Sequence, residues 1–128
     1  MEGSRCPFCK PPESEIIFRN KFAYVRHDKT PVSRGHLLVI PWRHVAGYFE
    51  TTAEERTAII DLIDDCKRFV DERYLPDGYN IGVNIGAVAG QSVMHVHIHF
   101  IPRYAGDTKR PSGGVRGVIP KMNEYGEG

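Results

Sequence analysis

The sequence predicts a single α+β domain in which one long helix packs on a mainly antiparallel sheet of about five strands. Three observations lead to this prediction. The length of 128 residues suits one domain better than two. One amphipathic segment at residues 51–74 has helical periodicity, and most of the remaining chain consists of short apolar segments between turn residues. One helix among several short strands is typical of α+β folds.

The first strands are predicted before the helix. Residues 22–25 indicate a short strand, after a weaker candidate at residues 16–18. Residues 28–31 predict a turn, because the proline at its end disfavours helical backbone in the residue before it. Residues 36–40 form a continuous apolar run that a proline ends, and this run predicts a central strand.

The long helix is the clearest element. Thr51 and Thr52 are candidate N-caps with Glu54 and Glu55 three residues after them, so either register makes a capping box. Seven side chains recur at helical spacing and predict one buried stripe. They are Ile59, Leu62, Ile63, Cys66, Phe69, Val70 and Tyr74. A Pro-Asp-Gly sequence ends the helix at residues 76–78.

Two strands and a tail are predicted after the helix. Residues 79–84 indicate a strand, and residues 85–92 form a loop of small residues in which the backbone can approach a ligand closely. Residues 93–101 predict the last strand, which a proline ends. The domain core therefore spans about residues 6–105, and residues 106–128 are its Gly/Pro-rich C-terminal tail.

Charge and hydropathy exclude several classes of protein. The 17 basic and 16 acidic side chains give a net charge of +1, which offers no bulk attraction to nucleic acid or to anionic membranes. No apolar run reaches the roughly 20 residues of a membrane span, and the N-terminus has no signal-peptide pattern. Three cysteines are an odd number, which argues against a secreted disulfide framework. We expect a cytoplasmic protein.

The most informative feature is the alternation of His95, His97 and His99 along the last predicted strand. Successive strand residues face opposite sides, so the three imidazoles share one face while the apolar residues between them face the core. Packing gives no reason for such a row. The row indicates either ligands of a catalytic metal or a nucleophile toward phosphorus. The preceding loop, residues 90–92, favours phosphorus chemistry, because its N–H groups, amide and hydroxyl suit phosphate oxygens.

These residues resemble the signature of the histidine triad family. Residues 90–101 (GQSVMHVHIHFI) contain its His-φ-His-φ-His-φ-φ pattern, where φ is apolar, and residues 35–41 (GHLLVIP) are similar to a second block of that family. The resemblance covers about residues 6–105. It implies a HIT-like fold with a five-stranded sheet, one long and one short helix, and a homodimer in which two sheets join into one.

The resemblance also implies an enzyme that cleaves bonds at the α-phosphorus of a purine nucleotide derivative, as a nucleotide hydrolase or nucleotidyl transferase. His97 would be the nucleophile, His99 would contact the phosphate, and His36 would help to shape the pocket. A nucleotide-binding sensor or partner protein with little turnover is the alternative, and a metallohydrolase is a second one. Dinucleoside polyphosphates and nucleoside phosphoramidates both stay open as substrates.

Further nucleotide contacts are implied residue by residue. Asp28, eight residues before His36, matches the position that holds the ribose hydroxyls, although plain turn formation would also explain it. The implied contacts on the phosphate side are Asn84, Gly90, Gln91 and Ser92. Weaker candidates for the base pocket are Phe8, Phe22 and Leu38, for which core packing is an equal explanation.

Cys6 and Cys9 form a C-x-x-C pair. A redox pair is expected in a βαβ pattern, which this segment lacks, so two structural cysteines or half of a zinc site remain. Several bacterial-type histidine triad proteins combine such a pair with the histidine of Pro-x-x-His and the first triad histidine, here His44 and His95. The resemblance thus implies a zinc ion with four protein ligands, which is structural and leaves the chemistry to the other two triad histidines.

Overall fold

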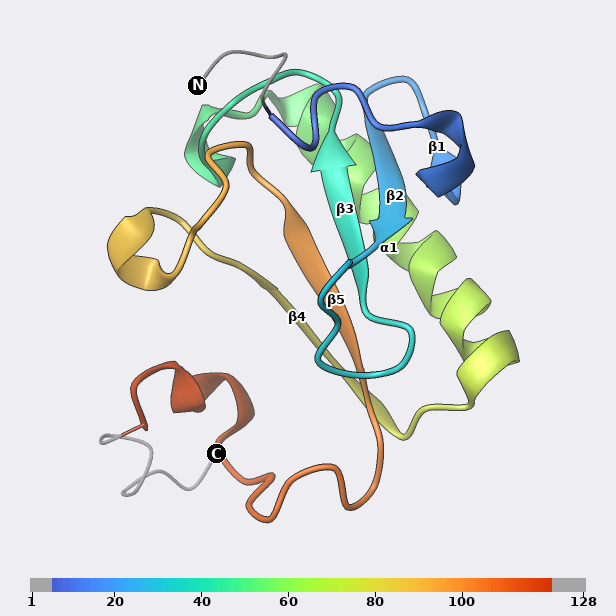
Figure 1. Cartoon of the computed structure of the whole chain (residues 1–128), viewed down its shortest axis with the longest axis vertical. Coiled ribbons are helices and arrows are strands. Elements are labelled where there is room, and N and C mark those ends of the chain that lie inside the picture. The colour runs from blue at the N-terminus through green and yellow to red at the C-terminus, as the bar shows by residue number, and fades with distance from the viewer. Residues whose placement is uncertain (1–5, 121–128) are drawn as a thin grey trace.

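The computed structural model describes residues 6–120 and confirms the α+β prediction. One five-stranded antiparallel sheet has the order β1-β2-β3-β5-β4 (Figure 1). The strands are β1 (Phe18–Arg19), β2 (Ala23–His27), β3 (Leu37–Pro41), β4 (Gly78–Val83) and β5 (Ile98–Arg103), and the long helix is α1 (Ala53–Tyr74). The short helices of the described residues are the 3-10 turns η2 (Glu13–Glu15), η3 (Tyr48–Glu50), η4 (Ala87–Ala89) and η5 (Gly114–Val118). Within residues 6–120, no helix is long and apolar enough to cross a membrane.

Helix α1 begins where the capping box predicts it, in the Thr52 register. The Thr52 hydroxyl accepts from the Glu55 N–H at 3.1 Å, and the Glu55 carboxylate accepts from the Thr52 N–H at 2.8 Å. Two of the N–H groups that a helix start leaves unpaired are thereby satisfied. The helix ends at Tyr74, and its C-cap Leu75 adopts a left-handed conformation with φ of 52° just before Pro76.

One face of the sheet is covered by α1, which lies behind β2 and β3 in Figure 1. The predicted stripe is confirmed: four of its residues are buried and the other three pack against the same core. The apolar residues that alternate with the triad histidines also face this core, as predicted. They are Val96, Ile98 and Phe100.

The opposite face of the sheet carries a second, smaller core under the N-terminal segment. Cys6 and Phe8 pack there against Tyr24, Leu38 and Ile40, which alternate with the helix-facing residues of β2 and β3. The Tyr24 hydroxyl donates to the Phe8 carbonyl oxygen at 2.5 Å. The C-x-x-C segment is therefore fixed on the same sheet face as the side chain of His99, whose Cα partner is Leu38.

The last strand differs from its predicted bounds, because β5 begins at Ile98 instead of residue 93. The preceding residues interact with the segment after β3: the Val96 N–H donates to the Val45 carbonyl, and the His95 ring to the Pro41 carbonyl, both at 2.8 Å. At its other end β5 continues through Pro102. The strand tolerates this proline because its missing N–H faces the β3 side, where pairing has already ended at Phe100.

Candidate active site and metal cluster

His97 is placed with a defined tautomer and is only 8% exposed. Its Nδ1 lies 2.9 Å from the main-chain oxygen of His95, and because a carbonyl can only accept, Nδ1 carries the proton. In the neutral ring the lone pair is then on Nε2. The Phe8 ring packs against the imidazole with 4.9 Å between ring centroids. His97 thus has the protonation pattern that a nucleophile attacking through Nε2 requires.

His36 and His99 form a hydrogen-bond chain beside His97. The Val32 N–H donates to His36 Nδ1 at 3.1 Å, so the proton of the neutral His36 ring is on Nε2. This Nε2 lies 2.9 Å from Nδ1 of His99 and 3.3 Å from a carboxylate oxygen of Asp28. His99 therefore accepts at Nδ1 and keeps its own proton on Nε2, where it is a hydrogen-bond donor. Its ring centroid is 5.2 Å from that of His97.

Burial keeps this chain neutral. It lowers the pKa of His36 below the ordinary value of 6.5, although the Asp28 carboxylate opposes the shift. It also lowers the pKa of His99, and the adjacent imidazoles of His97 and His36 lower it further. Near pH 7 each of the two rings then carries a single proton, which is the state that the hydrogen-bond chain requires.

The loop before the triad is held mainly by Gln91, which is 5% exposed. Its amide oxygen accepts from the Gly86 N–H at 2.9 Å, and its amide nitrogen donates to the carbonyls of Ala46 and Val93. The N–H groups of Gly90 and Gln91 also donate within the loop. These groups, which the sequence placed on the phosphate, are engaged inside the fold.

The other predicted contacts on the phosphate side are Ser92 and Asn84. The Ser92 side chain is exposed. Asn84 directly follows β4, where Val83 pairs with Ile98 at the start of β5, and its amide lies next to Gly90. Among the base-pocket candidates, Phe22 packs against the helix-side core, which places it away from the histidines.

The four predicted zinc ligands, Cys6, Cys9, His44 and His95, converge, with their ligand atoms within 4.8 Å of one another. The His95 Nδ1 is 3.3 Å from the Cys6 sulfur and 3.2 Å from the His44 Nδ1. The Cys9 sulfur is 3.1 Å from His44 and 3.5 Å from His95. A tetrahedral zinc ion with bonds of about 2.1 Å to nitrogen and 2.3 Å to sulfur needs edges of about 3.4–3.8 Å. The donor set fits zinc, and the quoted distances of 3.1–3.5 Å are a few tenths of an ångström shorter than or equal to these edges.

The hydrogen bonds of the histidines separate this cluster from a second group of possible ligands, Asp28, His36 and His99. His95 donates through Nε2 to the Pro41 carbonyl, so its Nδ1 lone pair points into the cysteine cluster. In the second group the His36 lone pair is already used by the Val32 N–H, and a proton occupies the nitrogen nearest the other two residues. The first group fits a metal, whereas the second fits a hydrogen-bond network.

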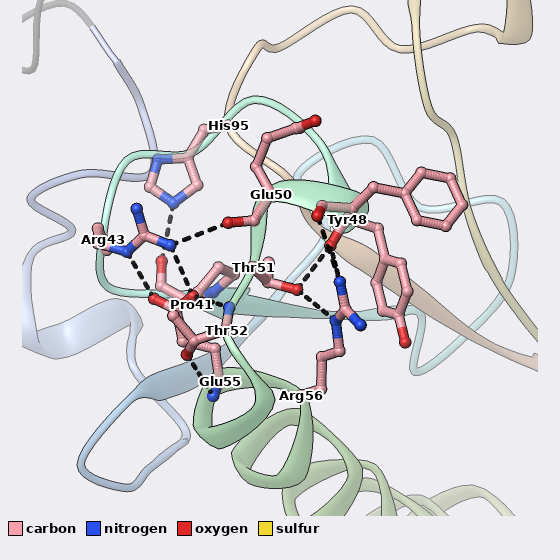
Figure 2. Close-up of polar contacts among 10 residues, drawn as sticks. Pro41, Arg43, Tyr48, Glu50, Thr51, Thr52, Glu55, Arg56 and His95 are labelled. Atoms are coloured by element: carbon pink, nitrogen blue, oxygen red, sulfur yellow. Dashed lines mark hydrogen bonds and ion pairs between the residues drawn. The ribbon is translucent and has the colours of Figure 1, made fainter.

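The loop that carries His44 is fixed by the start of α1 (Figure 2). The Arg43 guanidinium donates to both carboxylate oxygens of Glu55, at 2.9 Å each, and to the Glu50 carbonyl at 3.1 Å. These hydrogen bonds lower the pKa of the Glu55 carboxyl, which is almost fully buried. The capping box was visible in the sequence, but its contact with Arg43 was not.

A family model described as the HIT domain matches residues 10–106 of the chain. The chain belongs to the HIT family. An uncharacterised HIT-like protein of Methanocaldococcus jannaschii is 38% identical to this HIT protein over 108 residues, which cover 80% of this chain and 81% of that one. The resemblance found in the sequence is therefore confirmed.

Several relatives carry the names of enzymes. A bis(5'-nucleosyl)-tetraphosphatase (asymmetrical) of Schizosaccharomyces pombe is 33% identical over 97 residues, covering 76% of this chain and 53% of that one. An AP-4-A phosphorylase of Mycobacterium tuberculosis is 32% identical over 113 residues, covering 86% and 57%. This HIT protein spans little more than half the length of either enzyme.

Solved structures include a crystal structure of a zinc-bound histidine triad family protein from Mycobacterium smegmatis. It superposes with a TM-score of 0.73 at 27% sequence identity, and the match covers 97% of this chain and 99% of that one. The fold of the HIT protein is thus shared along nearly its whole length with a protein that is described as binding zinc.

Proposed function

We propose that this HIT protein is a cytoplasmic nucleotide hydrolase or nucleotidyl transferase that cleaves at the α-phosphorus of a dinucleoside polyphosphate or nucleoside phosphoramidate. The observation that carries the proposal is the pair of tautomers: His97 has an Nε2 lone pair, and the neighbouring His99 has an Nε2 proton. A nucleophile and a hydrogen-bond donor side by side suit attack on a phosphoryl group. The enzymatic names of two relatives support the same class of reaction.

The reaction follows in two steps. His97 Nε2 attacks the α-phosphorus, a phosphorus–nitrogen bond forms, and the bond to the leaving group breaks with its electron pair. The His95 carbonyl stabilises the positive charge that develops on the ring, since it accepts from Nδ1–H. Water then attacks the phosphorus, and the phosphorus–nitrogen bond breaks with its electron pair returning to Nε2. The nucleoside monophosphate is released, a proton of the water passes to solvent, and the imidazole is neutral again.

The remaining site residues position the substrate. His99 donates to a phosphoryl oxygen as its charge rises, and His36 maintains the tautomer that allows this. Ser92 and Asn84 bind the phosphate of the substrate, while Gly90 and Gln91 support this binding by holding the loop in shape. Asp28 holds the ribose hydroxyls and stabilises His36 through the same carboxylate.

The proposed function includes a structural zinc ion at Cys6, Cys9, His44 and His95. When bound, it would cross-link the N-terminal segment to the segment after β3 and the segment before β5. Protein purified without added zinc is expected to contain close to one equivalent, and less than about a tenth of an equivalent would contradict the proposal. Chelation should reduce activity slowly and through stability, whereas immediate loss at full stability would favour a metallohydrolase.

The proposed assembly is a homodimer in which β4 strands pair edge to edge. Strand β4 is the outermost strand on its side of the sheet, and its sequence, GYNIGV, has neither charge nor proline to block pairing. Light scattering should give twice the monomer mass. Ile81→Lys, which adds a charge to this strand at a 48%-exposed position, should give monomers. A monomeric wild type would refute the dimer.

The test of the reaction uses diadenosine tetraphosphate and an adenosine phosphoramidate with wild type and His97→Ala. We expect wild type to turn over at least one substrate and the variant to lose that activity, while both proteins bind AMP. The ratio of wild-type rates then selects the substrate class. Full activity in His97→Ala would refute the covalent mechanism. Wild type that binds AMP without any turnover would favour a nucleotide-binding sensor.

A further inference from the structure

Arg26 is a buried charged residue on the catalytic face of the sheet. It lies in β2, is 3% exposed, and its side chain is on the face opposite α1. Its Cα partner in β3 is Leu38, whose partner in β5 is His99, so the three side chains form one row across neighbouring strands. Two strand spacings separate the ends of this row, or about 10 Å. A nucleotide with its phosphate at His99 can therefore reach Arg26 with its base.

A cavity of about 110 Å³ lies beside Arg26 and Leu38 of this row, between the C-x-x-C segment and Asp28, the predicted ribose contact. It is lined by Pro7, Phe8, Arg26, Asp28, Lys29 and Leu38. Its apolar side is made by Phe8 and Leu38, and the Arg26 guanidinium carbon is 6.0 Å from the centroid of the Phe8 ring. An apolar wall with a fixed polar group at one end suits a flat heterocycle.

The hydrogen bonds of Arg26 leave donors unused. Its Nη2 donates to a carboxylate oxygen of Glu15 at 2.6 Å. Burial raises the pKa of the nearby Tyr24 hydroxyl, and the Arg26 guanidinium opposes that rise through its charge and a hydrogen bond. A guanidinium has five N–H donors, so the bond to Glu15 leaves a second N–H of Nη2 that forms a fork with a neighbouring nitrogen. Arg26 lines two cavities in which a ligand can meet this fork. Because Glu15 holds Nη2, the guanidinium is oriented without being saturated.

A purely structural role explains Arg26 poorly. Burying a guanidinium is costly, and an apolar residue would fill this place beside Leu38 and Phe8 without that penalty. Its partner Glu15 is on the short turn η2 with a side chain 34% exposed, and it also lies 3.6 Å from Lys29. Arg19 and Glu13 make the same kind of pair at the surface, where both side chains are exposed.

We propose that Arg26 determines base specificity by donating to two adjacent acceptors on the base edge, so that the site prefers guanosine to adenosine nucleotides. Guanine offers O6 and N7 as such a pair, whereas adenine offers N7 beside an amino group that is itself a donor. The inference rests on the proposed function, because it takes the phosphate to be at His97 and His99. A bidentate pair of this kind discriminates by about fivefold to a hundredfold.

The test compares guanosine and adenosine phosphoramidates in wild type, Arg26→Met and the matched control Arg19→Met. Wild type is expected to prefer guanosine in kcat/KM by about tenfold. Arg26→Met should lose this preference because kcat/KM falls for the guanosine substrate and stays the same for the adenosine substrate. Arg19→Met should keep the preference. Arg26→Lys, which retains the charge without the planar fork, should also lose most of it. An unchanged ratio in Arg26→Met, or a wild-type preference for adenosine, would overturn the assignment.

Binding of GMP and AMP, measured by calorimetry, gives the same comparison without turnover. Wild type should bind GMP about tenfold more tightly, and Arg26→Met should bind both equally. The outcome is independent of the mechanism, since His97→Ala abolishes turnover of both bases without altering their ratio of affinities. If Arg26→Met does not fold, Glu15→Gln offers a second route: it frees the guanidinium to move and should reduce the preference, and an unchanged preference would count against the proposal.

Discussion

The contact between Arg43 and Glu55 predicts that the start of α1 and the metal cluster are energetically linked. The Glu55 side chain is 5% exposed, and its carboxylate accepts two bonds from Arg43 and one from the Thr52 N–H. Glu55→Ala removes all three and leaves a buried gap. Hydrogen bonds to charged groups contribute about 1.5–3 kcal/mol each when buried, but Arg43 is half exposed, which reduces its share. We expect a loss of about 2–3 kcal/mol in unfolding free energy.

Glu55→Gln separates the two functions of this side chain. Its amide oxygen can still accept from the Thr52 N–H, so the capping box is retained while the charge opposite Arg43 is lost. The expected cost is about 1 kcal/mol. Because Arg43 precedes His44, the same change should loosen a metal ligand and speed zinc transfer to a colorimetric chelator by about fivefold, the factor equivalent to that energy. Glu54→Gln, an exposed position next to it in the same helix turn, is the control.

Urea denaturation and the chelator assay together test whether the contact between Arg43 and Glu55 links α1 to the metal cluster. Destabilisation by Glu55→Gln with zinc transfer as slow as in the control would show that the contact serves α1 alone. If Glu55→Ala were no less stable than Glu54→Gln, the energetic reasoning itself would be refuted.

Three further outcomes follow from the site. Gly90→Ala, at φ of +101°, should cost about 1–3 kcal/mol and lower kcat/KM, whereas Gly106→Ala, at φ of +83° and away from the site, should cost similar stability without affecting turnover. Because burial lowers the pKa of His36 and His99, unfolding free energy should rise with pH up to about 6.5 and level off above it, and His36→Gln should reduce that rise in urea titrations at pH 5–7.5. Val32→Pro removes the N–H that fixes the tautomer chain and should lower kcat about tenfold with a shifted pH profile, and Val32→Ala, which keeps the N–H, should change neither.

The sequence predicted the features that depend on local chemistry. The capping box is complete within four residues, which is why α1 begins within one residue of its predicted start. The bounds of β5 depend on bonds from His95 and Val96 to Pro41 and Val45, about 50 residues away, so periodicity alone extended the strand too far.

In the candidate site, too, short local patterns were predictable and long-range contacts were not. The metal quartet could be predicted because C-x-x-C and Pro-x-x-His are short patterns with known ligand chemistry. Arg26 gave no such signal, because a charged residue at the end of a short strand is usually solvated and only the packing of the N-terminal segment buries it. Val32 could not be found from its side chain at all, since its main-chain N–H makes the contact.

The three alternating histidines have different tautomers although they share a sequence pattern. His95 and His99 carry their proton on Nε2, while His97 carries it on Nδ1. The hydrogen-bond partner sets each tautomer: the Pro41 carbonyl for His95, the His36 ring for His99 and the His95 carbonyl for His97. If this assignment is correct, a glutamine amide can replace the donor of His99 but cannot replace the nucleophile. His99→Gln should therefore retain measurable turnover and His97→Gln none, in single-turnover assays of equally folded proteins. Equal loss in both variants would mean that His99 acts through more than its Nε2 proton.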